Sequence, residues 1–296
     1  YRDGGSGNGN QIYDCYDVKT QTWRPFLDTP LTDGQGTNNA YFNGPVRGPD
    51  GWFHLDWVWR ATPNASSCHD LSYARSRDLK HWETSTGKPL SLPIRLDNCE
   101  IIDPVPIHGG MINGNTKIGF DNEGRVTISY HKNDVHGNTQ PFVIRLENGH
   151  WVTHQVADWP VPARFSGEGT LPREIGLGPV HVGPDGRLLM AFAHFKYGRG
   201  TWVLDPQTLH AIGQVTVEAN PPDLDQVTGT FPGLEVHWVG DAGSSGIEGL
   251  QYKLRWETLE PNRDHPRHGA LPKPSMLQVI AVETERGTES HAARKN

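Results

Sequence analysis

The sequence predicts an all-β chain of the β-propeller class, and three observations lead to that prediction. The 296 residues include 34 Gly and 23 Pro, and no long helix-forming window separates them. The 10 tryptophans fall among short apolar runs. One pattern, a tight turn followed by an apolar strand, a polar loop, a second strand and a Trp, recurs along the chain. Many short strands with frequent turns are typical of repeated β architectures.

The first segment, Tyr1–Asn10, is rich in glycine. It lacks the Lys and the following helix of a phosphate-binding loop. A strand is expected over 11–17, and Trp23 closes a turn after it. Because glycine lets a backbone come close to other atoms, we expect this segment to approach a ligand.

The stretch Trp52–Trp82 defines the repeat. Its apolar runs, Trp52–Trp59 and Leu71–Ala74, are joined by a polar segment, Arg60–Asp70, and a second turn leads to the final Trp. This order is typical of the outer part of one propeller blade.

The turn before this stretch occurs three times. Pro49-Asp50-Gly51 has the composition of a type I turn, and Asn122-Glu123-Gly124 and Pro184-Asp185-Gly186 follow it after 73 and 62 residues (124 − 51 and 186 − 124). A strand and then a Trp follow each turn, at Trp82, Trp151 and Trp202. The spacing indicates an internal repeat of blade size.

The last copy is degenerate. Strands are expected over 234–239, 251–258 and 275–282, with a long Pro-containing loop over 259–274 and a polar tail over 284–296. We therefore count about five blade-like units in a single propeller domain over 1–296.

Composition excludes several function classes. The formal net charge of −7 disfavours a nucleic-acid partner, and no apolar run of about 18 residues predicts a membrane span. Three cysteines give neither a disulfide framework nor a metal pattern, and Cys68–Cys99 is the pair expected if any forms. The sequon Asn64-Ala65-Ser66 fits a secreted or periplasmic protein.

Arg60 and His69 are the first candidates for chemistry. Arg60 ends one expected strand and His69 begins the next, so we expect both at one rim of the fold. A guanidinium there pairs with a substrate carboxylate, and an imidazole moves a proton near neutral pH. The alternative is that each is a satisfied structural residue, which is the reading we favour for His54.

The next two copies carry polar groups in the equivalent place. Tyr130 and His131 end one strand, with Arg145 further along, and His194–Arg199 follows the corresponding strand of the next copy. Long polar loops at one rim favour binding, although solvated hairpin loops are the alternative.

Carboxylates support a competing hypothesis. Paired carboxyl groups would suit a glycoside hydrolase, with Asp56, Asp103, Asp121 and Glu168 as the candidates. The alternative is structural, because Asp-Pro is a common turn dipeptide and Asp121 is expected to serve its turn.

Five segments, in chain order, resemble the BNR-repeat-containing proteins, which include ulvan-lyase-like and rhamnosyl-glucuronate polysaccharide lyases. They are YRDGGSGNG at 1–9, WVWRATPNASSCHDLSYARS at 57–76, GMINGNTKIGFD at 110–121, YHKNDVHGNTQ at 130–140 and YKLRWETL at 252–259. The chain departs from the pattern at Cys68, where a polar residue is usual. The turn at 76–82 also lacks the Gly and Thr of the sialidase box.

The resemblance implies a seven-bladed propeller in which this chain begins mid-blade. An upstream segment or a second chain would then complete the propeller and carry the family's catalytic histidines. Tyr1 would occupy the place of the family's catalytic Tyr.

The favoured hypothesis is therefore β-elimination at a 4-linked uronate of an acidic polysaccharide. Arg60 would stabilise the enediolate, with Tyr1 and His69 in proton transfer. No cofactor is required, and a structural Ca²⁺ is compatible with the loops. A propeller glycoside hydrolase and a non-catalytic carbohydrate-binding propeller are the alternatives. The residues expected to bind substrate are Arg2, Asn39, Tyr130, His131, Arg145 and Tyr197.

Overall fold

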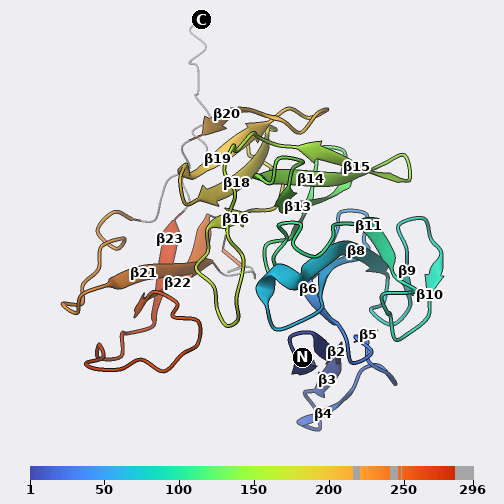
Figure 1. Ribbon diagram of the computed structural model, residues 1–296, viewed down its shortest axis with the longest axis horizontal. Coiled ribbons are helices and arrows are strands. Elements are labelled where there is room, and N and C mark those ends of the chain that lie inside the picture. The colour runs from blue at the N-terminus through green and yellow to red at the C-terminus, as the bar shows by residue number, and fades with distance from the viewer. Residues whose placement is uncertain (216–220, 241–245, 248, 284–296) are drawn as a thin grey trace, which may run out of the picture. The chain divides into compact units, whose positions relative to one another are not determined.

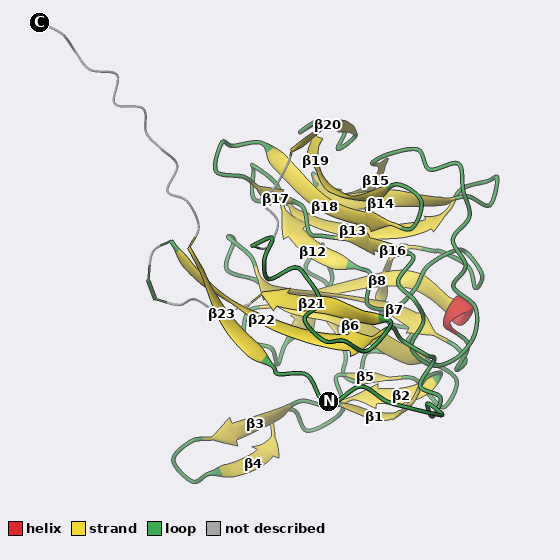
Figure 2. Cartoon of the chain, turned by 90° about the vertical axis from the view of Figure 1, so that its left-hand side faces the viewer, coloured by secondary structure: helices red, strands yellow, loops and turns green. Residues whose placement is uncertain are grey.

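The computed structural model describes residues 1–215, 221–240, 246–247 and 249–283. Within these residues it contains 23 strands and a single short 3₁₀ helix, η1 (Ala65–Ser67), which is shown in red in Figure 2. The predicted all-β class and the count of about five blade-like sheets of a propeller are confirmed. No helix in the described part of the chain has the length and apolarity to cross a membrane.

The chain divides into two compact units, Tyr1–Val217 and Glu218–Asn296. The polar tail expected over 284–296 lies outside the described residues.

The first unit holds four blade-like sheets, whose strands run from blue to yellow in Figure 1. Their strand orders are β1-β2-β5, β10-β9-β8-β7-β6 with β11 on β8, β12-β13-β14-β15, and β16-β18-β19-β20 with β17 on β18. The hairpin β3-β4 forms a sheet of its own and stands away from the others (Figure 2).

The strands of the first two sheets and the hairpin are β1 (Arg2–Gly5), β2 (Asn8–Gln11), β3 (Asp14–Asp17), β4 (Thr22–Pro25), β5 (Thr32–Asp33), β6 (Asn39–Arg47), β7 (Phe53–Arg60), β8 (Cys68–Ser76), β9 (Trp82–Glu83), β10 (Pro89–Leu90) and β11 (Glu100–Asp103). Those of the next two sheets are β12 (Lys117–Phe120), β13 (Val126–Asn133), β14 (Thr139–Glu147), β15 (His150–Gln155), β16 (Ile175–Leu177), β17 (His181–Val182), β18 (Leu188–His194), β19 (Gly198–Leu204) and β20 (Ala211–Val215).

The recurring turn joins β6 to β7, β12 to β13 and β17 to β18. Gly51, Gly124 and Gly186 have φ angles of +78°, +74° and +79°, which favour glycine over other residues. Their amide nitrogens donate to Gly48, Asp121 and Gly183 at 3.0, 2.9 and 2.9 Å. The internal repeat predicted from the spacing is therefore confirmed.

These turns define two ends of each blade. We call the end that carries the recurring turn the turn end. At the opposite end, here the loop end, β7 is joined to β8, β13 to β14 and β18 to β19. The joining segments are 61–67, 134–138 and 195–197. Neighbouring blades share this orientation, because Asn122 donates to Gly186 between turn ends and His108 donates to Ser66 between loop segments.

The core lies between the blades. Val58 and Leu71 of the second sheet share one cluster with Ile118 and Ile128 of the third, and all four are at most 6% exposed. Packing on both faces explains why nearly every residue of β7, and the first six residues of β13, are buried, including the polar ones. Trp57, Trp59 and Trp82 are buried core residues, as expected from the repeat. All three cysteines are free thiols, so the Cys68–Cys99 pair does not form.

The second unit contains the degenerate copy. Its sheet has the order β21-β22-β23, formed by Leu234–Gly240, Leu250–Leu259 and Gln278–Glu283. These strands match the three expected, and no described residue between β22 and β23 forms a strand. A buried ion pair between Arg255 and Glu257, at 2.9 Å, lies on β22.

Candidate functional site

Arg60 ends β7 at the loop end of the second sheet and is only 6% exposed. Its guanidinium donates to the carbonyl oxygens of Thr62, at 3.1 Å, and Pro63, and to Oδ1 of Asn113 at 3.0 Å. Within the described residues it forms no ion pair with a carboxylate. A buried guanidinium without a counter-ion is costly, because arginine stays charged in proteins.

A second guanidinium shares an aromatic neighbour with the first. Arg2 sits over the ring of Tyr41 at 5.0 Å, and Arg60 is 5.6 Å from the same ring. The Tyr41 hydroxyl shares a hydrogen bond of 2.5 Å with Ser6. We call these four residues the arginine cluster. Arg2 also has no carboxylate partner among the described residues, so the cluster presents two uncompensated positive charges.

The glycine-rich hairpin β1–β2 brings Arg2 and Ser6 to this place. Gly7 has a φ of +81°, and a Cβ there would lie 2.7 Å from the Cα of Thr62. The close approach predicted for this segment therefore exists, but it is made to the chain's own loop after Arg60. Glycine is required because any side chain would displace the hairpin from that loop.

Asn39 lies beside the cluster. It faces Arg60 across the β6–β7 ladder and is 1% exposed. Its Nδ2 has no hydrogen-bond partner within the described structure, although a buried amide normally finds one. Asn39 is thus an unused donor next to two cations.

His69 lies at the same end as Arg60 but on the other face of the sheet. A register shift pairs Trp59 with His69 and Arg60 with Cys68, and directly paired residues share a face. The prediction that Arg60 and His69 lie at one rim is right about the end of the sheet and wrong about the face. The His69 ring nitrogens lie 2.9 Å from the Asp70 carboxylate and 3.0 Å from the Asn38 amide oxygen.

Tyr1 precedes β1 and is 65% exposed. Its amino group donates to the carbonyl oxygen of Ile12 at 2.8 Å. In the described part of the chain its side chain makes no hydrogen bond or ring contact with Arg60 or His69. Its neighbour Arg2 is the link between this terminus and the cluster.

Tyr130 and His131 are not on a rim. Each is 1% exposed, because both faces of β13 pack against neighbouring blades. The Tyr130 hydroxyl donates to Asp103, and burial together with that carboxylate keeps its pKa well above the usual value. Lys132 holds the same carboxylate at 2.6 Å. The expected contact of Tyr130 with substrate is therefore wrong.

Both ring nitrogens of His131 are also hydrogen-bonded to protein groups. Its Nδ1 donates to the carbonyl oxygen of Gly110 at 2.7 Å, and Nε2 accepts from the Asn115 amide at 2.9 Å. Burial lowers its pKa to about 4, so the imidazole is neutral at physiological pH. Its expected substrate contact is also wrong.

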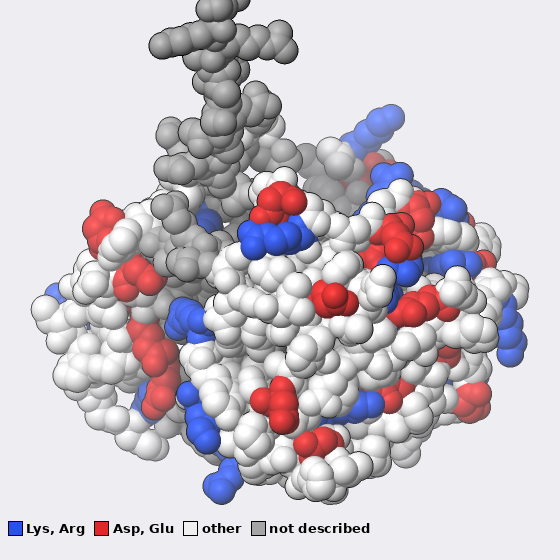
Figure 3. Space-filling view, turned by 90° about the horizontal axis from the view of Figure 1, so that it is seen from above, with Lys and Arg blue, Asp and Glu red and all other residues white. Residues whose placement is uncertain are grey.

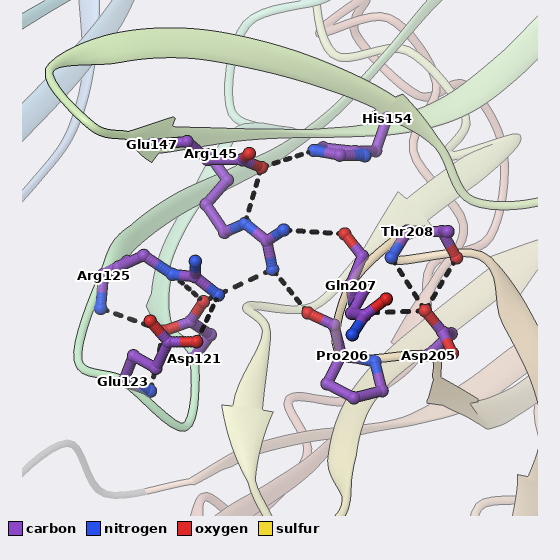
Figure 4. A network of polar contacts seen from close by, with 10 residues as sticks. All are labelled: Asp121, Glu123, Arg125, Arg145, Glu147, His154, Asp205, Pro206, Gln207 and Thr208. Carbon is purple, nitrogen blue, oxygen red and sulfur yellow. Dashed lines mark hydrogen bonds and ion pairs between the residues drawn. The ribbon is translucent and has the colours of Figure 1, made fainter.

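Arg145 lies at the turn end, opposite the arginine cluster, because it pairs with Thr127 near the start of β13. Figure 4 shows its guanidinium between Asp121 and Glu147, at 3.4 and 2.9 Å, and the carbonyl oxygens of Pro206 and Gln207, each at 2.7 Å. Two carboxylates already compensate its charge, so the structure gives no support to its expected role in sugar binding.

Tyr197 lies in the segment at the loop end of the fourth sheet and is 42% exposed. Its ring is available to solvent, in contrast to that of Tyr130. His54, expected to be structural, is 2% exposed and bonded to the Tyr73 hydroxyl at 2.6 Å. Burial lowers its pKa.

The carboxylates proposed for hydrolysis do not form an exposed pair. Asp56 is fully buried, and burial raises its pKa to about 7. Asp103 is occupied by Tyr130 and Lys132. Asp121 accepts from the backbone of its own turn, as predicted. Glu168 is exposed.

No metal site is evident in the described residues, since no group of three or more His, Cys, Asp or Glu side chains is placed to hold an ion. Acidic and basic side chains are interspersed over the face in Figure 3, and neither sign forms a continuous patch there.

Sequence reasoning missed Tyr41 and Ser6 of the cluster, and Asn113, which accepts a hydrogen bond from Arg60. Tyr41 could have been found, because it is two positions after Asn39 on the same strand and so shares its face. Ser6 and Asn113 come from distant segments, and no local signal marks them.

Comparison with known proteins places this geometry in context. Residues 1–159 match the family described as "BNR repeat-containing family member". No curated protein matches the chain.

Solved structures give a similar result. A polysaccharide lyase of family PL25, an ulvan lyase, has a TM-score of 0.54 at 11% identity over 95% of this chain and 60% of its own. The same enzyme family bound to -[GlcA(1-4)Rha3S]- gives 0.52 at 12% identity over 96% and 61%. An α-L-arabinofuranosidase from Clostridium thermocellum gives 0.34 at 13% identity over 82% and 72%. The chain thus spans about three fifths of the lyase chains, and the likeness shows the fold.

Proposed function

Because the chain belongs to the BNR repeat-containing family, we propose that it acts on an acidic polysaccharide as a lyase, cleaving a 4-linked uronate by β-elimination. The observation that carries the proposal is the arginine cluster, in which Arg2 and Arg60 have no carboxylate partner among the described residues. An anionic sugar would supply the missing charge. The ligand of the similar lyase, -[GlcA(1-4)Rha3S]-, supports a uronate-containing substrate.

The cluster matches the difficult part of this reaction. In β-elimination a base removes the C5 proton, the C4–O bond breaks, a C4–C5 double bond forms and the leaving oxygen gains a proton. The C5 carbanion delocalises into the carboxylate as an enediolate. Arg60 and Arg2 would hold that carboxylate, and their charges stabilise the intermediate more than the substrate. Arg60 is 6% exposed, and its buried setting strengthens this effect, whereas Arg2 is exposed.

Proton transfer is assigned to Tyr1. The Tyr1 phenol is exposed and adjoins Arg2 in sequence, so it can meet a sugar held there. His69 lies on the other face of the sheet, held by Asp70 and Asn38, and we assign it to substrate positioning at the loop end. We also propose that the protein is secreted or periplasmic, where such polysaccharides occur.

Hydrolysis is the weaker alternative. It needs two accessible carboxyl groups at a defined separation, and Asp56 and Asp103 are buried and occupied by other roles.

The experiment is to incubate the full-length protein with polysaccharides that contain 4-linked glucuronate. Elimination creates a C4–C5 unsaturated uronate, which absorbs in the ultraviolet, and this is the expected result. A new reducing end without that absorbance supports hydrolysis and rejects the proposal. Binding without any new chain end supports a non-catalytic carbohydrate-binding propeller.

A further inference from the structure

The loop end of the fourth sheet exposes two aromatic rings. The segment 195–197 joins β18 and β19, and Phe195 and Tyr197 are 56% and 42% exposed. Exposed aromatic rings that lie together on one loop are a common feature of binding surfaces.

The rings are held rigidly from below. His194 is 4% exposed, and its Nδ1 accepts the backbone N–H groups of Lys196 and Tyr197 at 3.0 and 3.3 Å. Phe195 stacks on His194 with centroids 4.6 Å apart, and the buried Trp159 lies 4.3 Å from the same imidazole. The segment is therefore preorganised, which lowers the entropy cost of binding.

One positive charge lies beside these rings. The Lys196 ammonium is 5.6 Å from the centre of the Tyr197 ring. Lys196 is exposed and forms no ion pair within the described residues. The surface thus offers apolar rings next to a cation, which suits a ligand with an apolar face and acidic groups.

The surface is connected to the arginine cluster. The Ala65 amide, in the loop that follows Arg60, donates to Gly167 at 2.8 Å, and the Phe195 amide donates to Glu174 at 2.9 Å. Seven residues separate Gly167 from Glu174 (174 − 167). Seven extended residues span at most about 25 Å, so one extended polymer can reach both places.

We propose that Phe195 and Tyr197 form a stacking subsite for a pyranose ring of the acidic polysaccharide, several sugars away from the uronate held at Arg60. The identity of the polymer as an acidic polysaccharide rests on the proposed function. The apolar face of the sugar ring packs on the aromatic rings, and an acidic substituent meets Lys196.

The test uses 4-linked uronate oligosaccharides of increasing length and the double variant Phe195→Ala/Tyr197→Ala. We expect KM for the long oligosaccharides to rise about five- to tenfold, with kcat and the KM of the shortest substrate unchanged. Tyr197→Phe keeps the ring and should behave as wild type. Trp23→Ala removes a ring that is 70% exposed on the separate hairpin β3–β4 and should change nothing.

Calorimetric binding of the longest oligosaccharide separates this proposal from the proposed function. If the wild type binds it without forming unsaturated product, and the double variant binds five- to tenfold more weakly, the subsite stands and the lyase assignment fails. If unsaturated product forms and long and short substrates respond equally to the substitutions, the subsite is rejected. If no acidic oligosaccharide binds, both proposals are rejected. An unchanged melting temperature shows that the double variant is folded.

Discussion

Arg60 and Arg145 are buried arginines in adjacent sheets of the same unit, with 6% and 2% of their surface exposed. Arg145 lies between two carboxylates and two carbonyl oxygens (Figure 4). Arg60 has two carbonyls, one amide and an aromatic ring, but no carboxylate within the described residues. The difference indicates that Arg145 serves the fold, whereas Arg60 still has a charge to offer a ligand.

The largest effect is expected from Arg60→Ala. Removing a charge aimed at the developing enediolate should lower kcat/KM on the acidic polysaccharide by about 10²- to 10³-fold. Arg60→Lys keeps the charge and loses the forked geometry, so it should recover only part of the activity. Arg187→Ala, at an exposed ion pair of the turn end, is the control and should leave kcat/KM unchanged. Full activity in Arg60→Ala would show that Arg60, like Arg145, does not act on the substrate.

The next effect is on stability, from Arg145→Ala. This substitution removes the more distant of two guanidinium groups paired with Asp121, whose side chain is 1% exposed, while Arg125 stays at 2.7 Å. It also leaves the carbonyl oxygens of Pro206 and Gln207 without their donor. Because Arg125 still compensates the charge of Asp121, we expect a loss of about 2–3 kcal/mol of unfolding free energy, below that for a charge left unpaired. Chemical denaturation should show this loss in Arg145→Ala and a smaller loss in Arg60→Ala. Equal losses in the two variants would show that the carboxylates around Arg145 do not distinguish the two sites.

A pH-dependent effect on stability is expected from Asp56, a buried carboxyl group whose pKa is raised to about 7 by burial. Unlike Arg60, Asp56 can lose its charge, because the carboxylate can take up a proton. The folded state then binds more protons than the unfolded state between about pH 4 and pH 7, so stability falls as pH rises through that window. Asp56→Asn removes this slope and should gain up to about 4 kcal/mol at pH 8.

Denaturant midpoints measured across this pH range test the Asp56 prediction. His131 contributes the opposite slope, because burial lowers its pKa to about 4 and stability is lost as pH falls from about 6.5. Asp56→Asn should therefore become more sensitive to acid than the wild type. A variant with the wild-type pH profile would mean that Asp56 is charged in the folded protein.

The repeat could be predicted from the sequence because its signals are local. The three Gly turns and the apolar runs after them required only neighbouring residues, and the structure confirms both. Arg60, Tyr130 and Arg145 all carry polar groups near strand ends, so composition could not separate them. The separation depends on which strand end each occupies and on what packs against it.

The sheet face on which His69 lies could not be predicted from the sequence, for a different reason. One register shift, between Val58 and Trp59, places His69 and Arg60 on opposite faces of the sheet. A bulge of one residue changes the face of every side chain beyond it, and the polar loop gave no signal for it. Tyr41 is the opposite case, because the two-residue periodicity of a strand places it on the same face as Asn39 and would have been enough to predict its position.

The arginine cluster also has a consequence for folding. Ser6 meets Tyr41 across 35 positions of the chain, and Arg60 meets Asn113 across 53. Contacts between such distant positions pay the entropy of closing long loops before they form. The cluster is therefore assembled late, after the second and third sheets have formed and packed together. Anion recognition should appear only in the fully folded chain and not in the individual blades.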